Sequence, residues 1–471
     1  MKVCFVYPDV GGVEHYGARK YYHGLGYISA MLKAAGHKTA LIYLLREPSR
    51  EAFLRELAGH DPAVVAFSST THQHPLVEQC ARWIKEEQPE RFVLSGGTHP
   101  TLAPEAVALS PDIDAICVGE GELATLDLIE RLAAGAPITE IQNLWMRDGE
   151  IWHRNPSRAL IENLDDLPFA DRELFDSRQM LAHNDGWVDL MAGRGCPYDC
   201  SYCCNPGLKA QYHGLGRYVR FRSVDNLLRE IEELAGRYPV RTLNFQDDTF
   251  TLNRKWALEF CEAYTGRFEF PFWINTRVER VLDDEELVSA LARAHCRGVR
   301  IGLESGNEQL RKDILKRGMS NDDIRRAVRL LRRHGLQVST CNMIGIPGET
   351  PAMIDETIAL NRELAPDNLQ FSVFYPYPMT ELHDVAVEQG LVQAGHAIAG
   401  YYERESVLDL PDIAPEELAE KYDRFMALKS DLRVQREHPW RYRARRLLLA
   451  LLGGDEKRLR KVLDMVRGRA E

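Results

Sequence analysis

The sequence lacks the features of a secreted or membrane-embedded protein. Its first two residues lead directly into the apolar run 3–7, with no signal-peptide pattern before it. No uninterrupted apolar stretch approaches the ~20 residues that a membrane-spanning helix needs, and the closest, at 447–452, is far too short. We therefore expect a cytoplasmic protein without a membrane span.

An excess of positive charge is also missing. The chain has 59 Lys and Arg against 70 Asp and Glu, a net charge of −11, which argues against a general nucleic-acid-binding protein. Residues 431–471 differ from the rest, with 12 Lys and Arg against 6 Asp and Glu. A basic tail on an acidic body can indicate a docking surface for a protein partner, although a solvated helical face is the commoner explanation because exposed helices are usually charged.

Internal repeats are absent, but strand and helix patterns alternate along most of the chain. The first series predicts strands at 3–7, 39–43, 64–68, 92–94 and 115–118, with helices at 25–35, 50–58 and 76–87. Such alternation predicts a parallel, doubly wound α/β sheet, whose ligands bind outside the carboxyl ends of the strands. We assign this domain to residues 1–140, followed by a linker with a small hairpin at 141–187.

The second series predicts further parallel βα units over residues 188–385. Its expected strands are 188–191, 242–246, 272–275, 298–303, 338–344 and 368–373, with intervening helices such as 224–237 and 321–334. Residues 386–471 read as a helical C-terminal region.

Cysteine usage divides into two patterns. Six of the ten cysteines are scattered singly in apolar or helical segments and read as buried small hydrophobes. The other four crowd into the loop 196–204 with the spacing C-x3-C-x2-C at Cys196, Cys200 and Cys203, followed directly by Cys204. Three thiolates in one short loop can hold three irons of a [4Fe–4S] cluster, which leaves one iron open for a substrate.

Other interpretations of this loop stay open at this point. A zinc knuckle would need a fourth ligand, which Cys204 or His213 could supply. A redox C-x-x-C pair at Cys200 and Cys203 would leave Cys196 without a role. A C-x3-C-x3-C spacing that ends at Cys204 is also formally available.

The loop resembles the signature of the radical S-adenosylmethionine (SAM) superfamily, C-x3-C-x-aromatic-C, with Tyr202 as the aromatic residue. The aromatic favours Cys203 as the third cluster ligand. The resemblance implies a partial TIM-type (β/α)6 barrel, a [4Fe–4S] cluster and reductive cleavage of SAM to a 5′-deoxyadenosyl radical. It also implies a small-molecule substrate and an electron donor such as flavodoxin or ferredoxin.

Several strand ends in the second series resemble the SAM-binding segments of that superfamily. Asp247 or Asp248 would accept from the SAM ammonium, and Arg277 would face its carboxylate. Asp248 as a helix cap, Arg277 in a surface ion pair, and turn glycines are the structural alternatives. The full set that the resemblance implies is Tyr202, Gln246, Asp247, Asp248, Arg277, Glu304, Gly345 and Pro347.

The first domain resembles the cobalamin-binding domain that precedes the barrel in a large subclass of these enzymes. A flat corrin needs strand ends with little side-chain bulk, and small hydroxyl groups suit its nucleotide tail. The implied cobalamin-binding residues are Ser68, Ser69, Thr70, Gly96, Gly97, Thr98, His99, Gly119, Glu120 and Gly121.

A cobalt-ligand motif is present only in half. Many cobalamin domains carry D-x-H-x-x-G, and here His23 and Gly26 supply the second half while Tyr21 replaces the aspartate. That aspartate orients the imidazole, so we predict that His23 does not coordinate cobalt.

The resemblance thus implies a cobalamin-dependent radical SAM enzyme, most simply a C-methyltransferase acting on an unactivated carbon of a small molecule or natural product. The alternative is a radical SAM dehydratase, epimerase or cyclase with a vestigial cobalamin domain. A non-enzymatic sensor is the third hypothesis. Substrate choice should depend on residues 376–471, and the aromatic segments 375–380 and 401–402 are candidates for it.

Overall fold

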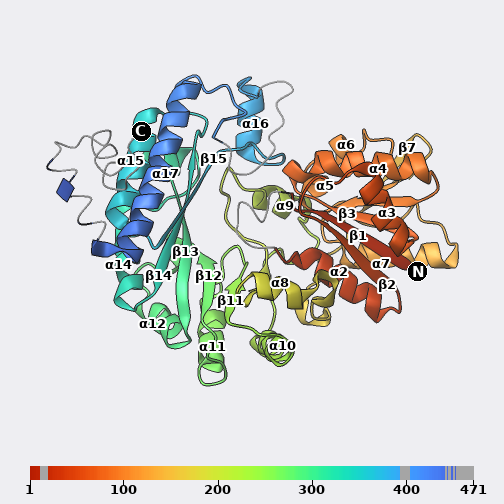
Figure 1. The fold of residues 1–471 in the computed structure, drawn as a ribbon, viewed down its shortest axis with the longest axis horizontal. Helices are drawn as coiled ribbons and strands as arrows, with labels where there is room; N and C mark the ends of the chain where they lie inside the picture. The colour runs from red at the N-terminus through yellow and green to blue at the C-terminus, as the bar shows by residue number, and fades with distance from the viewer. Residues whose placement is uncertain (11–19, 393–403, 441–442, 444–446, 449–450, 452–471) are drawn as a thin grey trace, which may run out of the picture.

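The computed structural model describes residues 1–10, 20–392, 404–440, 443, 447–448 and 451. Two α/β bodies lie side by side, and the loop before helix α9 (Asn205–Gln211) runs between them (Figure 1). The segment 401–402 and most of the basic tail fall outside the described residues. None of the helices in the described part combines the length and hydropathy that crossing a membrane requires.

The N-terminal body is built on a sheet with the described strand order β2-β1-β3-β4-β5-β6-β7. The first five strands are parallel, as predicted. Their bounds are β1 Lys2–Pro8, β2 Lys38–Leu44, β3 Val64–Ser68, β4 Phe92–Gly96 and β5 Ala115–Cys117. The order reverses direction beside β1, and ligands bind at such switch points in doubly wound sheets.

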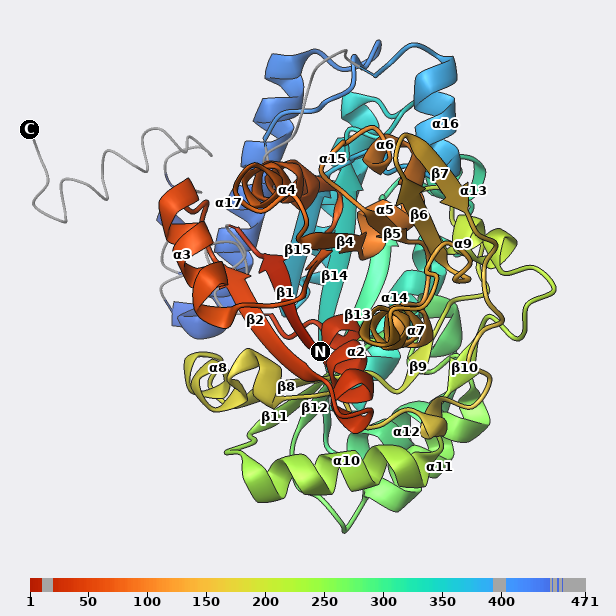
Figure 2. The same ribbon diagram turned by 90° about the vertical axis from the view of Figure 1, so that its right-hand side faces the viewer.

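Helices cover both faces of this sheet because its buried strands are apolar on both sides. One face packs against α2 (His23–Ala34) and α7 (Glu122–Ala134) through residues such as Leu32 and Leu128. The other packs against α3 (Arg50–His60) and α4 (His74–Glu87) through residues such as Phe53 and Ile84. Short helices α5 (Thr98–Leu102) and α6 (Pro104–Val107) follow β4 (Figure 2).

The predicted hairpin exists and belongs to this sheet. Strands β6 (Leu144–Asp148) and β7 (Ile151–Arg154) turn at Gly149, and β6 pairs antiparallel with β5. The first sheet therefore continues beyond residue 140. The short helix η1 (Thr71–Gln73) lies between β3 and α4 of the first body. The connection to the second body holds η2 (Leu164–Asp166), η3 (Glu173–Phe175) and α8 (Ser177–His183).

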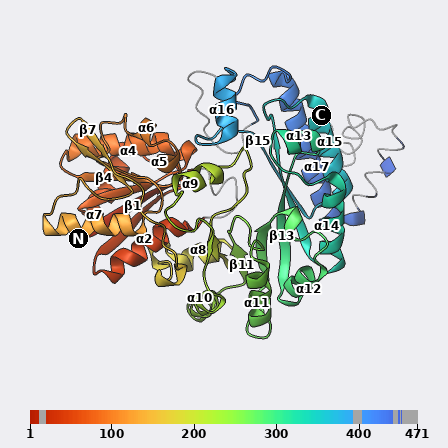
Figure 3. The ribbon, with the colours of Figure 1, turned by 180° about the vertical axis from the view of Figure 1, so that it is seen from behind.

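The second body is a curved sheet of parallel strands in sequential order, β8-β11-β12-β13-β14-β15, the half-barrel that the resemblance implied. The strands are β8 Trp187–Leu190, β11 Thr242–Phe245, β12 Phe272–Thr276, β13 Cys296–Glu304, β14 Gln337–Ile344 and β15 Asn368–Val373. Sequential parallel strands require crossover helices, which lie on the outer side, away from the N-terminal body (Figures 1 and 3). These helices are α10 Val224–Arg237, α11 Arg254–Tyr264, α12 Glu285–Arg293, α13 Glu308–Asp313, α14 Asn321–Arg333 and α15 Pro351–Leu364.

Alternation along the second set of strands separates an apolar outer face from a polar inner face. On β13, Val299, Ile301 and Leu303 are buried in the core beneath the helices. The intervening residues, which include Arg300 and Glu304, therefore face the concave side. The C-terminal region adds α16 (Glu381–Glu388) and α17 (Pro415–Glu437), and α17 packs on α15 and β15.

Candidate active site

The cysteine loop leaves the half-barrel through a two-stranded stem. Strand β9 (Gly193–Arg194) pairs antiparallel with β10 (Arg220–Phe221), and we call these two strands the stem. The loop that carries Cys196, Cys200 and Cys203 and helix α9 lie between them in sequence. Both ends of the cysteine loop are thereby fixed by one short ladder.

Cys200 and Cys203 accept hydrogen bonds at sulfur. Arg277 Nη1 donates to Cys200 Sγ at 3.1 Å, while the backbone and side-chain nitrogens of Asn205 both lie 3.5 Å from Cys203 Sγ. Hydrogen bonding from Cys204, together with Asn205, lowers the pKa of the Cys203 thiol to about 6. The same contact holds the pKa of Cys204 well above its usual range. Of these two neighbours, Cys203 is the one whose sulfur accepts from both nitrogens of Asn205, contacts that stabilise a thiolate.

Among the described residues, no three Cys, His, Asp or Glu side chains converge closely enough to hold a single metal ion. A mononuclear zinc knuckle requires such convergence. A cubane cluster takes one thiolate on each iron, so its ligands need not meet at one point.

The two predicted aspartates of the β11 end have different environments. Asp247 is buried and accepts from the backbone nitrogens of Ala192, at 3.1 Å, and Gly193, at 2.6 Å. Burial raises the pKa of Asp247 to about 7, although those two donors oppose the shift. Asp248 is exposed and accepts from Asn205 Nδ2 at 3.2 Å. Asp247 thus binds the backbone that enters the stem, whereas Asp248 presents its carboxylate outward.

Gln246 has a partner that the sequence did not indicate. Its Nε2 donates to Asp189 Oδ1 at 2.9 Å, and Asn244 Nδ2 donates to the same oxygen at 2.6 Å. The amide group of Gln246 is therefore oriented by β8.

Glu304, Tyr202 and Arg317 form one buried cluster. Arg317 Nη1 lies 2.8 Å from Glu304 Oε1, and the Tyr202 hydroxyl donates to the same oxygen at 3.0 Å. Burial raises the pKa of the Glu304 carboxyl, opposed by Arg317. The positive charge of Arg277 also acts on Glu304. Arg277 Nη2 lies 2.7 Å from Glu279 Oε1, and the guanidinium lies 3.7 Å from the Tyr198 ring centre. Arg277 is thus directed at Cys200 and at its own neighbour Glu279.

The β14 end forms a tight turn rather than an open polar site. Gly345 has φ +74°, and its N–H donates to Glu349 Oε2 at 2.7 Å. Burial raises the pKa of Glu349 to about 8. Pro347 lies in this same turn, and the Glu349 carboxylate holds the turn by accepting from the backbone nitrogens of Gly345 and Ile346.

The predicted cobalamin residues meet at the carboxyl ends of β3, β4 and β5. Gly97 has φ +98°, and a Cβ there would lie 2.7 Å from both Ser68 Oγ and the Ser69 nitrogen. Close packing between the ends of β3 and β4 therefore requires glycine at position 97. This reason differs from the space that a corrin would need above the strand ends, on which the sequence-based prediction rests.

The other polar residues of this edge are largely engaged within the domain. Thr70 and Gln73 form a capping box at η1, and His99 N–H donates to Ser69 O at 3.0 Å. The rings of His99 and His74 lie 4.4 Å apart, and burial lowers the pKa of His99 to about 4 and that of His74 to about 3.

The loop 119–121 contacts the second body. The Tyr212 hydroxyl covers Gly119 and accepts from Glu120 N–H at 2.8 Å. Arg220 binds the Glu120 carboxylate in a bidentate pair at 2.5 and 3.1 Å, and Arg194 lies 3.2 Å from it. Burial opposes ionisation of Glu120, yet these arginines hold the pKa of its carboxyl below the usual range.

His23 begins α2 and is buried, with no hydrogen-bond partner for Nε2. Burial lowers its pKa to about 4, and the Arg172 guanidinium acts in the same direction. A neutral imidazole with one unpaired nitrogen is chemically able to bind a metal, whereas its position at the helix start is explained by packing against Tyr21 at 5.1 Å.

One cavity of about 430 Å³ joins the two bodies. Ser68, Gly96, Gly97, Thr98 and the loop 119–121 line it from the N-terminal body. Its other wall includes Cys204, Asn205, Gln246, Asp247 and Asp248 from the half-barrel. Gln246, Asp247 and Asp248 therefore face the same space as the predicted cobalamin edge, whereas Cys196, Cys200 and Cys203 do not line this cavity.

Residues 190–360 match the model of the radical SAM superfamily, and residues 14–129 match that of the B12 binding domain. The chain carries a B12 binding domain followed by a radical SAM domain.

The chain is also similar to known proteins over most of its length. An uncharacterized methyltransferase of Pyrococcus horikoshii is 27% identical over 371 residues, 78% of this chain and 79% of that protein. An anaerobic magnesium-protoporphyrin IX monomethyl ester cyclase of Rubrivivax gelatinosus is 26% identical over 394 residues, 81% of this chain and 69% of that protein.

A solved structure shares the fold along most of its length. The radical SAM methyltransferase TsrM from Kitasatospora setae, solved with cobalamin and a [4Fe–4S] cluster, superposes with a TM-score of 0.69 at 17% identity, covering 91% of this chain and 88% of that one. The predicted fold class is confirmed, and so is the prediction of a radical SAM enzyme with a B12 binding domain.

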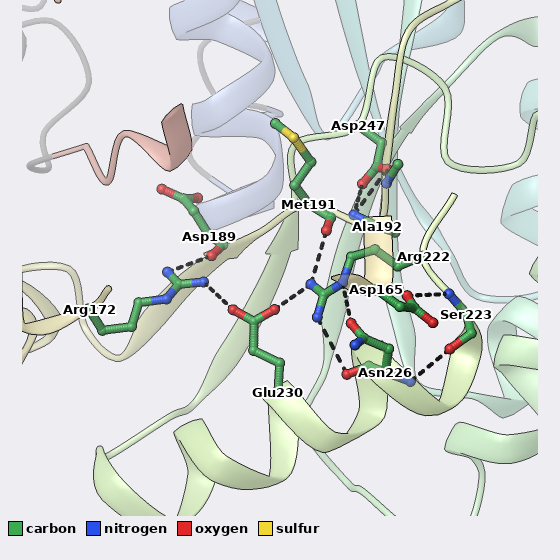
Figure 4. Close-up of polar contacts among 11 residues, drawn as sticks. Asp165, Arg172, Asp189, Met191, Ala192, Arg222, Ser223, Asn226, Glu230 and Asp247 are labelled. Atoms are coloured by element: carbon green, nitrogen blue, oxygen red, sulfur yellow. Dashed lines mark hydrogen bonds and ion pairs between the residues drawn. The ribbon is translucent and has the colours of Figure 1, made fainter. Parts of the chain in front are cut away.

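Figure 4 shows a buried charge network that sequence reasoning missed and that joins the connecting segment to the half-barrel. Glu230 on α10 pairs with Arg172 at 3.1 Å and with Arg222. Arg172 Nη1 also donates to Asp189 O at 2.9 Å, and Arg222 Nη1 donates to Met191 O at 3.3 Å. The network fixes the backbone on both sides of the β8 end, next to the residues that bind Asp247.

Proposed function

We propose that this protein is a cobalamin-dependent radical SAM methyltransferase that modifies an unactivated carbon of a small molecule. The observation that carries the proposal is the shared cavity. The cobalamin-type strand ends line it on one side, and the β11 end and the flanks of the cysteine loop line it on the other. A methyl group carried on one cofactor can reach a substrate activated by the other only if both face one space.

We propose Cys196, Cys200 and Cys203 as ligands of a [4Fe–4S] cluster. Two of their sulfur atoms already accept hydrogen bonds, and the Arg277 guanidinium beside Cys200 would offset the negative charge of a thiolate-bound cluster. When bound, the cluster supplies the electron that cleaves SAM, and cobalamin carries the methyl group.

The SAM site that we propose lies where the cavity meets β11. The exposed Asp248 carboxylate can accept from the SAM ammonium, while Asn205 holds one of its oxygens in place. Asp247 supports this site from behind, because its carboxylate binds Ala192 and Gly193. Tyr202, Gln246, Arg277, Glu304, Gly345 and Pro347 remain proposed members of the site.

For cobalamin we propose the edge formed by Ser68, Gly96, Gly97, Thr98 and the loop 119–121, all of which line the cavity. Ser69, Thr70 and His99 lie just behind it and would act by holding Ser68 and Gly97 in place. The Glu120 carboxylate is committed to two arginines, so its contribution to cobalamin would come from the backbone. His23 is proposed to stay off cobalt.

The electron donor is proposed to be a small redox protein such as flavodoxin or ferredoxin. Docking at the basic segment 431–471 stays a prediction, because most of that segment lies outside the described residues. A cytoplasmic location is proposed because free cysteines and cluster thiolates require a reducing compartment.

One experiment tests the function directly. Anaerobically reconstituted protein is incubated with hydroxocobalamin, a reductant and SAM carrying a ¹³C-labelled methyl group. We expect about one corrinoid retained per chain, recovery of the ¹³C methyl group on that corrinoid, and release of 5′-deoxyadenosine.

The second candidate function is cyclisation, dehydration or epimerisation without methylation, which the similarity to the Rubrivivax gelatinosus cyclase favours. In that case 5′-deoxyadenosine would form while no labelled methyl group reached a corrinoid. Failure of the protein to retain any corrinoid would also contradict the methyltransferase proposal.

A further inference from the structure

The stem forms ion pairs with the N-terminal body. Arg194 lies on β9, Arg220 lies on β10, and the two residues are direct partners in the antiparallel ladder. Both bind Glu120, and Arg194 also binds Glu122 at 2.5 Å. Two adjacent guanidinium groups of the radical SAM domain thus hold two carboxylates of the B12 binding domain.

We propose that Glu120 is a positioning residue that fixes the separation between the cobalamin edge and the cluster loop. The purpose of this arrangement rests on the proposed function, whereas the positioning itself rests on the contacts of Glu120 with Arg194, Arg220 and Tyr212. Glu120 lies between the two glycines that line the cavity, so any displacement of its carboxylate moves the surface proposed to face the corrin.

The stem transmits this position to both parts of the proposed radical SAM site. Residues 195–219, including the three cysteines, leave and re-enter through the stem, so its placement sets where the loop begins and ends. Asp247 accepts from Gly193 N–H at 2.6 Å, directly beside Arg194. A shift of β9 would therefore move the cluster loop and the β11 end together.

A third contact holds the backbone of Glu120 as well as its carboxylate. Tyr212, at the end of α9, accepts from Glu120 N–H at 2.8 Å, while the Glu120 side chain reaches the stem. Arg220 is 4% exposed, and its Nη1 also donates to Ile161 O at 2.8 Å. Glu120 is thus held at its backbone by the helix that follows the cysteines and at its carboxylate by the strands that flank them.

Such fixation matters for chemistry that uses two cofactors in one cavity. A misplacement of about 1 Å between reacting groups can reduce a rate by roughly 100-fold. Charge-assisted, bidentate Arg–carboxylate pairs restrict both distance and orientation, which single neutral contacts do not.

The test compares Glu120→Gln with Glu105→Gln as the matched control. Glu105 belongs to the same domain and forms an exposed pair with Arg154 at 2.6 Å, so its variant also removes one carboxylate charge and one ion pair. Glu120→Asp is the second variant, because it keeps the negative charge but shortens the side chain by one methylene group. It replaces Glu120→Gln in the test if that variant does not fold.

The first readout is backbone hydrogen exchange of cofactor-free protein. We expect Glu120→Gln to accelerate exchange at least tenfold both at 119–122 and in the stem, with a smaller effect of Glu120→Asp and none of Glu105→Gln. Acceleration confined to 119–122, or absent, would overturn the proposal.

The second readout is the magnetic interaction between Co(II) of bound cobalamin and the reduced cluster, measured by electron paramagnetic resonance at saturating hydroxocobalamin. We expect a changed or broadened interaction in Glu120→Gln at unchanged iron and sulfide content. An interaction identical to that of the wild type would contradict the proposal. If the wild type binds no corrinoid, the proposed function fails, and hydrogen exchange alone decides the role of Glu120.

Discussion

Some residues of the candidate site can be predicted from the sequence, and others depend on how distant segments pack. The C-x3-C-x2-C spacing predicts the cluster loop without knowledge of the fold, since ligand spacing within one loop is a local property of the sequence. Arg317 was missed because it lies in a loop without a motif, and its pairing with Glu304 depends on how β13 and the following segment pack. Glu304, by contrast, was placed at a strand end by the hydrophobic pattern around it.

The choice between Cys203 and Cys204 gives a prediction at this scale. The Cys203→Ala protein should lose the cluster, because Cys203 follows the aromatic Tyr202 and its sulfur accepts from both nitrogens of Asn205. The Cys204→Ala protein should keep it. Iron and sulfide analysis after anaerobic reconstitution should give about four of each per chain for the wild type. Loss in Cys204→Ala with retention in Cys203→Ala would reverse the assignment.

Arg317 gives a second prediction. Arg317 is 4% exposed and neutralises the buried Glu304, and breaking a buried ion pair costs about 3–5 kcal/mol because it leaves one charge uncompensated. We expect Arg317→Met to lower the free energy of unfolding by about that amount in urea titrations.

The double variant Arg317→Met, Glu304→Gln is its control. It removes the uncompensated charge, so it should recover much of the lost stability. A double variant as unstable as the single one would show that Arg317 acts through packing and not through charge.

Among the secondary-structure elements, strands were predicted better than their contacts. The strand 64–68 was predicted with its observed bounds, because a short apolar run between turn residues is unambiguous. The hairpin at 144–154 was also predicted, but its pairing with β5 was not, since strand partners are set by tertiary packing. Polar residues alternate with apolar ones along the strands of the half-barrel. Which of the two faces is the inner one became clear only from the buried core.

The β4 end gives a prediction that separates backbone strain from crowding. Gly97→Ala would place a Cβ 2.7 Å from Ser68 Oγ and the Ser69 nitrogen, adding about 1–3 kcal/mol of overpacking to the left-handed strain of about 1–2 kcal/mol. Gly36→Ala has similar strain at φ +83° but meets nothing within 4 Å.

Thermal or urea unfolding should therefore rank Gly97→Ala as clearly less stable than Gly36→Ala, and only Gly97→Ala should lose hydroxocobalamin binding. Equal stability of the two variants would show that the strand end relaxes around the new methyl group.

The histidine pair on α4 and α5 gives a pH prediction. Burial lowers the pKa of His99 from about 6.5 to about 4, so the folded state prefers the neutral ring. Its contribution to stability is complete above pH 6.5 and is lost as the pH falls toward 4. By pH 5 the loss should be about 2 kcal/mol for this group.

We expect the wild type to lose more stability than His99→Asn between pH 7.5 and pH 5 in urea titrations. Parallel pH profiles for the two proteins would show that His99 does not titrate in this range.

At the scale of the whole molecule, the sequence predicted two domains but not how they meet. The cavity, the stem and the arginines that bind Glu120 join segments from residue 5 to residue 248, and no local pattern encodes such proximity. Glu120 was predicted for cobalamin because it lies between two glycines, and the fold gives its carboxylate a different partner.

The most direct test of the account is reductive cleavage of SAM by the anaerobically reconstituted protein. With cluster, cobalamin, SAM and a strong reductant, we predict 5′-deoxyadenosine formation that requires the reductant and is abolished in Cys196→Ala, Cys200→Ala and Cys203→Ala. The reconstituted protein should hold about four irons and four sulfides per chain. A fully loaded wild-type protein that releases no 5′-deoxyadenosine, or Cys200→Ala protein that still releases it, would contradict the assignment of radical SAM chemistry to this loop.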